Sequence, residues 1–154
     1  MEADDHDLVP RDALRELLET LVEAFELDAT VTIEEGDGVV LGRVDGPDVG
    51  VLVGDHGSML DAIQHLAQRF VLRGGEGLRV RVDIDGYRAR REVELRAEAD
   101  EAAERALAEG RPVALAPMLA ADRRVVHEHL RDRTDIETHS EGEEPQRRLV
   151  VAPA

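Results

Sequence analysis

The spacing of apolar side chains predicts a helix and then a hairpin near the start of the chain. After Pro10, a residue favoured in a first helical turn, apolar residues recur every three or four positions, which predicts an amphipathic helix over residues 11–26. Two runs rich in β-branched residues, 30–35 and 39–44, then flank a Gly-Asp-Gly turn at 36–38. This pattern is typical of a β-hairpin.

A second amphipathic helix is predicted directly after a pair of glycines, Gly54 and Gly57. Ser58 is followed three residues later by Asp61, which is a capping-box pattern, so we expect Ser58 to cap this helix. Apolar residues continue at helical spacing behind it, and the glycines at 74–75 are expected to end it. The glycine pair therefore lies in a short loop immediately ahead of a helix.

A strand and a long helix follow. Apolar and polar residues alternate over 78–84, which predicts a half-buried strand with a partly basic outer face. From Tyr87 the residues are mostly Ala, Glu and Arg, which favour a helix, and Gly110 is expected to close it. The small residues expected on its buried side are Val93, Ala99, Ala103, Ala106 and Leu107.

The remaining chain alternates between short elements of both kinds. The pattern predicts an extended segment at 111–118, a helix at 119–132 and two strands at 136–140 and 147–152. The order is thus helix, strand, strand, helix, strand, and then helix, strand, helix, strand, strand. We predict an α+β protein made of two small α/β sandwich domains, joined near Gly86.

Charge is distributed unevenly along the 154 residues. The formal net charge is −16, and residues 1–62 hold 17 acidic residues against 3 arginines. Residues 69–96, by contrast, hold 5 acidic residues against 8 arginines. The average charge argues against a polyanionic partner, and a solvated acidic surface is the simplest interpretation of the first third. The basic stretch at 69–96 nevertheless leaves a polyanionic partner possible.

Composition also excludes several kinds of chemistry. The absence of cysteine rules out disulfides, thiolate nucleophiles and cysteine-type zinc sites. Aromatic residues make up only 2% of the chain, so platforms for stacking nucleobases are few. No apolar run approaches the roughly 18 residues of a membrane span, and the first ten residues are acidic. We therefore expect a cytoplasmic protein that does not insert into membranes.

The loop between Gly54 and Gly57 is the first candidate site. Such a loop lets a phosphate backbone approach the amides that begin the next helix, yet it holds Asp55 and His56. A carboxylate about 4 Å from a phosphate repels it by roughly 1 kcal/mol in water and about 4 kcal/mol at an intermediate dielectric constant. His56 offsets this only when protonated. The loop is therefore either a nucleic-acid contact or a tight turn needed only for folding.

The second candidate site lies on the predicted helix at 119–132. Arg123 and His127 are four positions apart, so their side chains share one helix face, where a guanidinium and an imidazole could hold one phosphate together. The alternative is a solvated face, or an arginine that pairs with Asp122 or Glu128.

Further arginines could extend a phosphate-binding surface. Arg124 adds a charge to the same helix, and Arg147 and Arg148 begin the last predicted strand. Such a patch would bind by counterion release with little sequence preference. Another group of arginines could contact nucleic acid or instead neutralise the acidic first helix: Arg79, Arg81, Arg88, Arg90 and Arg91.

An enzymatic site is the least supported interpretation. His127 and His129 flank Glu128, but side chains two positions apart on a helix point about 160° away from each other. His139 would have to approach one of them across the fold. We therefore expect neither catalysis nor a bound metal or cofactor.

The motifs together resemble those of one protein family. In order and spacing they are similar to the Jag proteins, also called SpoIIIJ-associated proteins, over nearly the whole chain from about Asp12. These proteins pair a type II KH domain with a domain named for its Arg-x-x-x-His motif, the R-3-H domain. The segments that carry the resemblance are VGVLVGDHGSMLDAIQHLAQ, RVRVDIDGYRARRE, RPVALAPM, DRRVVHEHL and ETHSEGEEPQRRLVVAP.

The resemblance implies a domain division and a function. It places an acidic tail at 1–11, a KH-like domain at 12–86 and an R-3-H domain at 87–154. It implies binding of single-stranded RNA in the cytoplasm, a regulatory role in cell elongation and envelope synthesis, and a small KH protein or a second copy of the chain as partner. Together with the arginines placed near these motifs, the residues we expect to contact RNA are Gly54, Asp55, His56, Gly57, Arg123, Arg124, His127, Arg147 and Arg148.

One departure from the family pattern leaves an alternative function. The family's loop usually holds one or two basic residues between its glycines, whereas this chain has Asp55 and His56. The KH frame could therefore have lost RNA binding at this loop and serve as a protein-interaction module.

Overall fold

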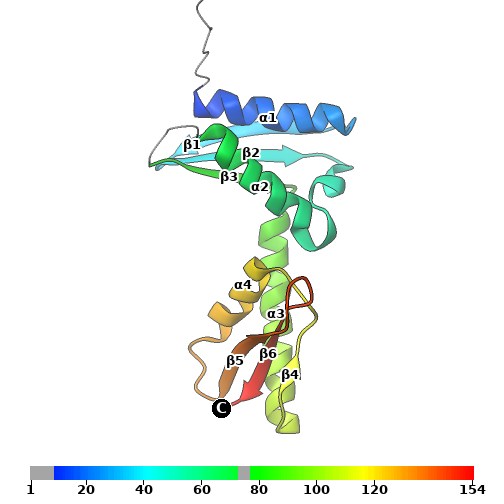
Figure 1. Ribbon diagram of the computed structural model, residues 1–154, viewed down its shortest axis with the longest axis vertical. Coiled ribbons are helices and arrows are strands. Elements are labelled where there is room, and N and C mark those ends of the chain that lie inside the picture. The colour runs from blue at the N-terminus through cyan, green and yellow to red at the C-terminus, as the bar shows by residue number, and fades with distance from the viewer. Residues whose placement is uncertain (1–8, 73–76) are drawn as a thin grey trace, which may run out of the picture. The chain divides into compact units, whose positions relative to one another are not determined.

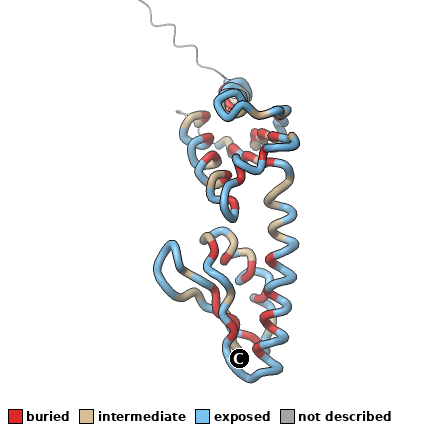
Figure 2. Tube along the Cα trace, turned by 90° about the vertical axis from the view of Figure 1, so that its right-hand side faces the viewer, coloured by how far each residue is buried: buried red, intermediate tan, exposed pale blue. Residues whose placement is uncertain are grey.

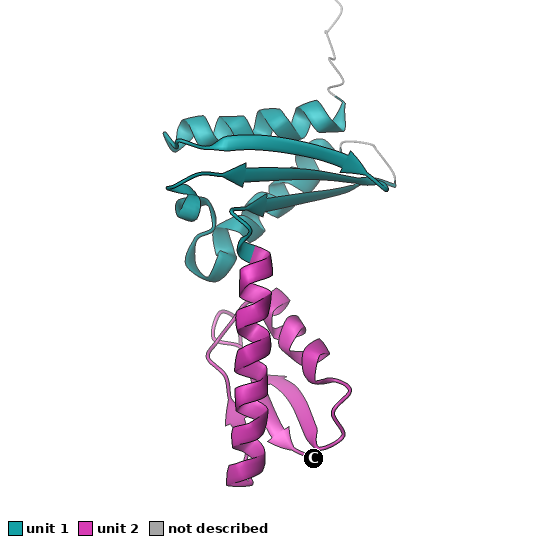
Figure 3. Cartoon of the chain, turned by 180° about the vertical axis from the view of Figure 1, so that it is seen from behind, with its two compact units in different colours: residues 1–87 teal, residues 88–154 magenta. Residues whose placement is uncertain are grey.

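A computed structural model of the chain describes residues 9–72 and 77–154 (Figure 1). Contacts divide the chain after Tyr87 into two compact units, residues 1–87 and residues 88–154 (Figure 3). Each unit combines helices with a three-stranded sheet and has its own buried core. The predicted α+β class, with two small sheet-and-helix units, is confirmed.

The first unit is a sheet with two helices packed on one face. Its strands lie in the order β1-β2-β3, with β1 and β2 antiparallel and β2 and β3 parallel. Alternate residues of β2 and β3 are buried under α1 and α2, as the apolar spacing predicts. The elements are α1 (Pro10–Ala24), β1 (Thr30–Gly36), β2 (Val39–Asp45), η1 (Val49–Leu52), η2 (Asp55–Gly57), α2 (Ser58–Val71) and β3 (Arg79–Ile84).

A side chain from α2 covers the outer edge of β3. Gln64 donates from Nε2 to the carbonyl of Val80 at 2.7 Å and accepts from the amide of Val82 at 2.8 Å. Its amide group thus makes the two bonds that a neighbouring strand would make at this position. The opposite edge of the sheet, formed by β1, has no strand neighbour within residues 9–72 and 77–154.

The second unit packs a long and a short helix against a second sheet. Its strands lie in the order β4-β6-β5, all antiparallel, and the central strand β6 is the most buried. The elements agree with the predicted ones in kind and position: α3 (Tyr87–Glu109), β4 (Val113–Ala114), α4 (Ala120–Leu130), β5 (Ile136–Glu141) and β6 (Arg148–Pro153).

The buried side of α3 agrees with the predicted one at Ala99, Ala103 and Ala106 but differs at two positions. Val93 is 69% exposed and Leu107 is 38% exposed, so neither belongs to the core. At about 100° per residue, Val93 lies nearly opposite the buried stripe, which recurs at helical spacing (Figure 2). That stripe consists of Leu95, Ala99, Ala102, Ala103 and Ala106. A helix with so few large apolar residues gives a weak periodic signal.

Candidate nucleic-acid interface

The two glycines of the loop before α2 are required by the backbone. Gly54 has φ +73° and Gly57 has φ +84°, values that other residues rarely adopt. A Cβ on Gly54 would lie 2.8 Å from the amide nitrogen of Met59, and one on Gly57 would lie 2.8 Å from Cε1 of Tyr87. The glycine pair is therefore explained by folding alone, whether or not the loop also binds a ligand.

The start of α2 differs from the predicted capping box. Gly57, in a left-handed conformation, holds the N-cap position, and Ser58 is already the first helical residue with no side-chain capping bond. The carbonyl of Val53 instead accepts the amides of both Met59 and Leu60, each at 3.0 Å. The predicted end of the helix at 74–75 lies outside the described residues, and α2 ends at 71.

These bonds limit what the loop offers to a phosphate. The amide of Ser58 donates to the carbonyl of Asp55, and the next two amides donate to Val53. The amides that begin the helix, expected to face a phosphate, are thus used inside the fold. Over the part of the chain that the structure describes, the amides of Asp55 and His56 are the ones in this loop with no acceptor.

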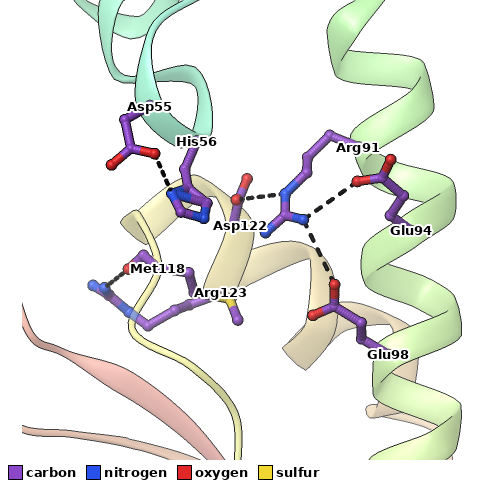
Figure 4. Close-up of polar contacts among 8 residues, drawn as sticks. All are labelled: Asp55, His56, Arg91, Glu94, Glu98, Met118, Asp122 and Arg123. Atoms are coloured by element: carbon purple, nitrogen blue, oxygen red, sulfur yellow. Dashed lines mark hydrogen bonds and ion pairs between the residues drawn. The ribbon is translucent and has the colours of Figure 1, made fainter.

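Asp55 and His56 project from the tip of this loop and pair with each other. The Asp55 side chain is 92% exposed, and its Oδ1 lies 3.0 Å from Nδ1 of His56 (Figure 4). A proton on His56 is therefore offset by the adjacent carboxylate. The tip of the loop presents a negative charge at neutral pH.

Arg123 is buried and tied to two other segments of the second unit. Its residue exposure is 8%, although an arginine on a short helix would usually be exposed. Nη1 donates to the carbonyl of Met118 at 2.5 Å (Figure 4) and to that of Arg147 at 3.5 Å. Nη2 donates to Oε1 of Glu144 at 2.5 Å. Arg123 thus anchors the loop between β5 and β6 to α4.

His127 contacts the same hairpin but remains exposed. Its Nδ1 lies 2.5 Å from Oγ1 of Thr138 on β5. Within the described ranges, Nε2 of His127 has no hydrogen-bond partner. The two residues of the Arg-x-x-x-His motif therefore both fix α4 to the β5–β6 hairpin, and the imidazole is the more accessible of the two.

The other predicted arginines of this unit also have partners: two pair with carboxylates and one bonds backbone carbonyls. Arg124 pairs with Glu128 at 2.9 Å, and Arg148 pairs with Glu141 across the strands at 2.7 Å. These hydrogen bonds hold the pKa of Glu128 and the pKa of Glu141 below their usual range. Arg147 donates to backbone carbonyls of its own hairpin, with the shorter bond at 2.6 Å. Exposed ion pairs contribute little to stability, so a phosphate could replace either carboxylate.

Asp122, one of the two acids considered as a partner for Arg123, pairs instead with Arg91 of α3. The distance between Nε of Arg91 and Oδ2 of Asp122 is 3.1 Å, and both side chains are largely buried (Figure 4). Glu94 and Glu98 also lie within 4 Å of this guanidinium. Burial opposes the charge on Arg91, but its acidic neighbours outweigh burial and raise its pKa. This arginine is structural and is not part of a free basic patch.

Arg79 and Arg81 lie on the face of the first sheet that α1 and α2 leave uncovered. Both side chains are exposed, and neither forms an ion pair within the described part of the chain. Between β1 and β3, by contrast, Arg43 lies 3.7 Å from Glu34 and 3.5 Å from Asp83. The outer face of β3 is therefore modestly basic.

The histidines of the second unit point to different partners. His129 reaches Asp100 of α3 at 2.9 Å, whereas His139 lies 3.7 Å from Glu141. Among the residues that the structure describes, no group of three or more His, Asp or Glu side chains could hold a metal ion. A search of the same residues finds no helix with the length and apolar character needed to cross a bilayer.

Two α+β units, one with a Gly-x-x-Gly loop and one with an Arg-x-x-x-His helix, define the class of tandem KH and R-3-H proteins. Comparison with family models gives the same division: the KhpA/KhpB KH domain matches residues 11–84 and the R-3-H domain matches residues 93–153. The chain belongs to the Jag family.

Curated relatives share both domains with this chain. It is 33% identical to the RNA-binding protein KhpB of Lactiplantibacillus plantarum, over 91% of this chain and 44% of the relative. It is 30% identical to the KhpB proteins of Clostridium symbiosum, over 92% of this chain and 65% of the relative, and of Bacillus subtilis, over 88% and 66%. The chain thus spans between about half and two thirds of the length of these relatives.

Proposed function

We propose that this protein binds single-stranded RNA without catalysing a reaction. The observation that carries the proposal is the tandem arrangement of a KhpA/KhpB-type KH domain and an R-3-H domain, together with relatives named as RNA-binding proteins. KH domains clamp a short stretch of single-stranded backbone at their glycine loop. The proposal requires no cofactor.

The second unit is the better supported contact for RNA in this chain. Arg124 and Arg148 are exposed and paired with carboxylates that a phosphate could displace, and His127, on the same helix as Arg124, presents an exposed imidazole. Such contacts read the backbone and not the bases. We therefore expect modest affinity, weak sequence preference and a strong dependence on salt.

The loop of the first unit contributes less. Its two available amides belong to Asp55 and His56, and the Asp55 carboxylate stands beside them. A carboxylate about 4 Å from a phosphate opposes binding by roughly 1–4 kcal/mol, depending on the local dielectric constant. Gly54 and Gly57 shape this loop, so all four residues remain proposed contacts, with Asp55 acting against binding.

Resemblance to the Jag family supports a wider role that we also propose. The protein would act in the cytoplasm, in the regulation of cell elongation and envelope synthesis. A small KH protein would be its partner, and the name of the family model, which covers both KhpA and KhpB, supports such pairing. A second copy of the chain is the other proposed partner.

Titration of a fluorescent single-stranded RNA with the full chain tests the proposal. Anisotropy should rise with protein at about 50 mM salt and much less at about 200 mM. His127→Ala should weaken binding, whereas His65→Ala, on the exposed side of α2, serves as a matched control and should not. No binding at either salt concentration contradicts the proposal.

A second variant assigns the contribution of the loop. Asp55→Lys replaces the negative charge at the loop tip with a positive one, so it should tighten binding if RNA passes over this loop. An unchanged affinity would assign binding to the second unit alone.

The exposed carboxylate of Asp55 also favours a second candidate function, a protein-interaction module that has lost RNA binding at the KH loop. Affinity capture of the tagged chain from lysate distinguishes the two. Recovery of a protein after nuclease treatment, with no RNA recovered from untreated lysate, would favour the interaction module.

A further inference from the structure

We propose that Glu144 is an internal competitor for the phosphate group that Arg123 would bind. The inference rests on the proposed RNA contact at the Arg-x-x-x-His motif. Nη2 of Arg123 donates to the Glu144 carboxylate at 2.5 Å, the place on the guanidinium where a phosphate oxygen would make the same charge-assisted bond.

The three hydrogen-bond partners of Arg123 differ in how easily a phosphate could displace them. Two are backbone carbonyls, of Met118 and Arg147, and a ligand could replace them only by moving the main chain. The third is a side chain that faces solvent, since Glu144 is 57% exposed and Arg123 only 10%. A phosphate can therefore reach this guanidinium by displacing Glu144 while the two carbonyls continue to hold it in place.

The loop that carries Glu144 is held by bonds that do not involve its carboxylate. The amide of Gln146 donates to the carbonyl of Glu143 at 2.8 Å, and Arg147 donates to the carbonyl of Gly142 at 2.6 Å. Rotation of the Glu144 side chain away from Arg123 leaves these bonds intact. The exchange of carboxylate for phosphate thus needs a change of rotamer and no refolding of the hairpin.

Binding of the fluorescent RNA to Glu144→Gln and to Glu143→Gln tests the inference. Both variants remove one negative charge from the same loop, but the Glu143 side chain makes no ion pair within the described residues. Glu144→Gln should bind about fivefold tighter or more, and Glu143→Gln clearly less so. The slope of log affinity against log salt should steepen by about 0.7 in Glu144→Gln only, as one more phosphate is neutralised. Equal effects of the two variants, or weaker binding by Glu144→Gln, overturn the inference.

A titration with inorganic phosphate keeps this inference separable from the function on which it rests. The Nε–H resonance of Arg123, followed by NMR, should move with phosphate in Glu144→Gln and stay in place in the unsubstituted protein. If no variant binds RNA, the proposed function fails, and this titration alone decides whether Glu144 shields Arg123 from phosphate. No movement in either protein overturns the inference.

Discussion

At the scale of single residues, Gly54 and Arg123 occupy positions that few other residue types would tolerate. Gly54 has both a positive φ and a close neighbour, since its missing Cβ leaves room for the backbone of Met59. Arg123 is buried, and its guanidinium donates hydrogen bonds to groups from two other segments. Substitutions at these positions should therefore cost much more than the same substitutions nearby.

Gly54→Ala should lower the free energy of unfolding by about 1–3 kcal/mol, because alanine at φ +73° is strained and its Cβ would lie 2.8 Å from Met59 N. Gly50→Ala is the matched control, since no atom lies within 4 Å of its Cβ position. Urea unfolding followed by circular dichroism measures both. Equal stabilities of the two variants would contradict the steric argument.

Arg123→Met should also destabilise the protein, by about 1–3 kcal/mol, because the carbonyl of Met118 loses its side-chain donor and the carbonyl of Arg147 keeps only the amide of Met118. Arg124→Met, one position along the same helix, removes only an exposed pair with Glu128 and should change stability by less than about 0.5 kcal/mol. If an Arg123 variant fails to bind RNA, its stability must also be measured, because unfolding alone could abolish binding. His127→Ala tests binding more directly.

At the scale of elements, the burial of apolar residues determines most of the fold. The spacing of apolar residues in the sequence indicates which of them are buried. The hairpin, α1 and β3 could be predicted because their apolar residues alternate or recur with the period of the element. On α3 the pattern correctly predicts three buried alanines but wrongly adds Val93 and Leu107, because alanine packs well but contrasts little with its neighbours. The capping-box spacing wrongly predicts Ser58 as the cap, because spacing alone cannot show the left-handed Gly57.

The candidate site was less predictable than the fold, for a physical reason. The shared helix face of Arg123 and His127 follows from local spacing, but the partners of Arg123 include residues 21 and 24 positions away in the chain. Which arginine is buried depends on where the β5–β6 loop passes. Sequence spacing therefore predicted the motif but not that Arg123 serves as an anchor.

The cross-strand pair on the second sheet should give a pH effect. A hydrogen bond from Arg148 lowers the pKa of Glu141, so its stabilising contribution is present above the ordinary glutamate pKa of about 4.3 and is lost as the pH falls through the lower folded-state pKa. An NMR titration of the Glu141 carboxyl carbon should show the lowered pKa, and Arg148→Gln should raise it. An ordinary pKa in the unsubstituted protein would contradict this expectation.

Gln64→Ala should expose the covered edge of β3. The loss of its bonds to Val80 and Val82 should cost about 1–2 kcal/mol and speed hydrogen exchange at the Val82 amide. Gln68→Ala, on an exposed position of the same helix, is the control and should leave that amide protected. Unchanged exchange in Gln64→Ala would mean that the side chain does not protect this edge.

At the scale of the whole molecule, each unit has a core of its own. Leu60 belongs to the core of the first unit and Leu95 to that of the second, and both are about 1% exposed. A net charge of −16 opposes approach to RNA, so the local arginines must act at short range and in low salt. We therefore expect each unit to unfold independently and to make its own contribution to RNA binding.

Leu60→Ala and Leu95→Ala test this independence. Each should destabilise its own unit by about 2–5 kcal/mol through the cavity it leaves. Hydrogen exchange should then accelerate mainly in residues 10–84 for the first variant and in residues 95–151 for the second. Acceleration of both units by either variant would show that they unfold together.

The glutamine that covers the edge of β3 has a consequence for self-association. With Gln64 bonded to Val80 and Val82, the sheet of the first unit has one blunted border, and β1 is the border left without a strand neighbour among the described residues. Two copies that met through β1 would each use up the one open edge of this sheet. Edge pairing through the first unit's sheet would then end at a closed pair, and its continuation through β3 would require the loss of the Gln64 side-chain bonds.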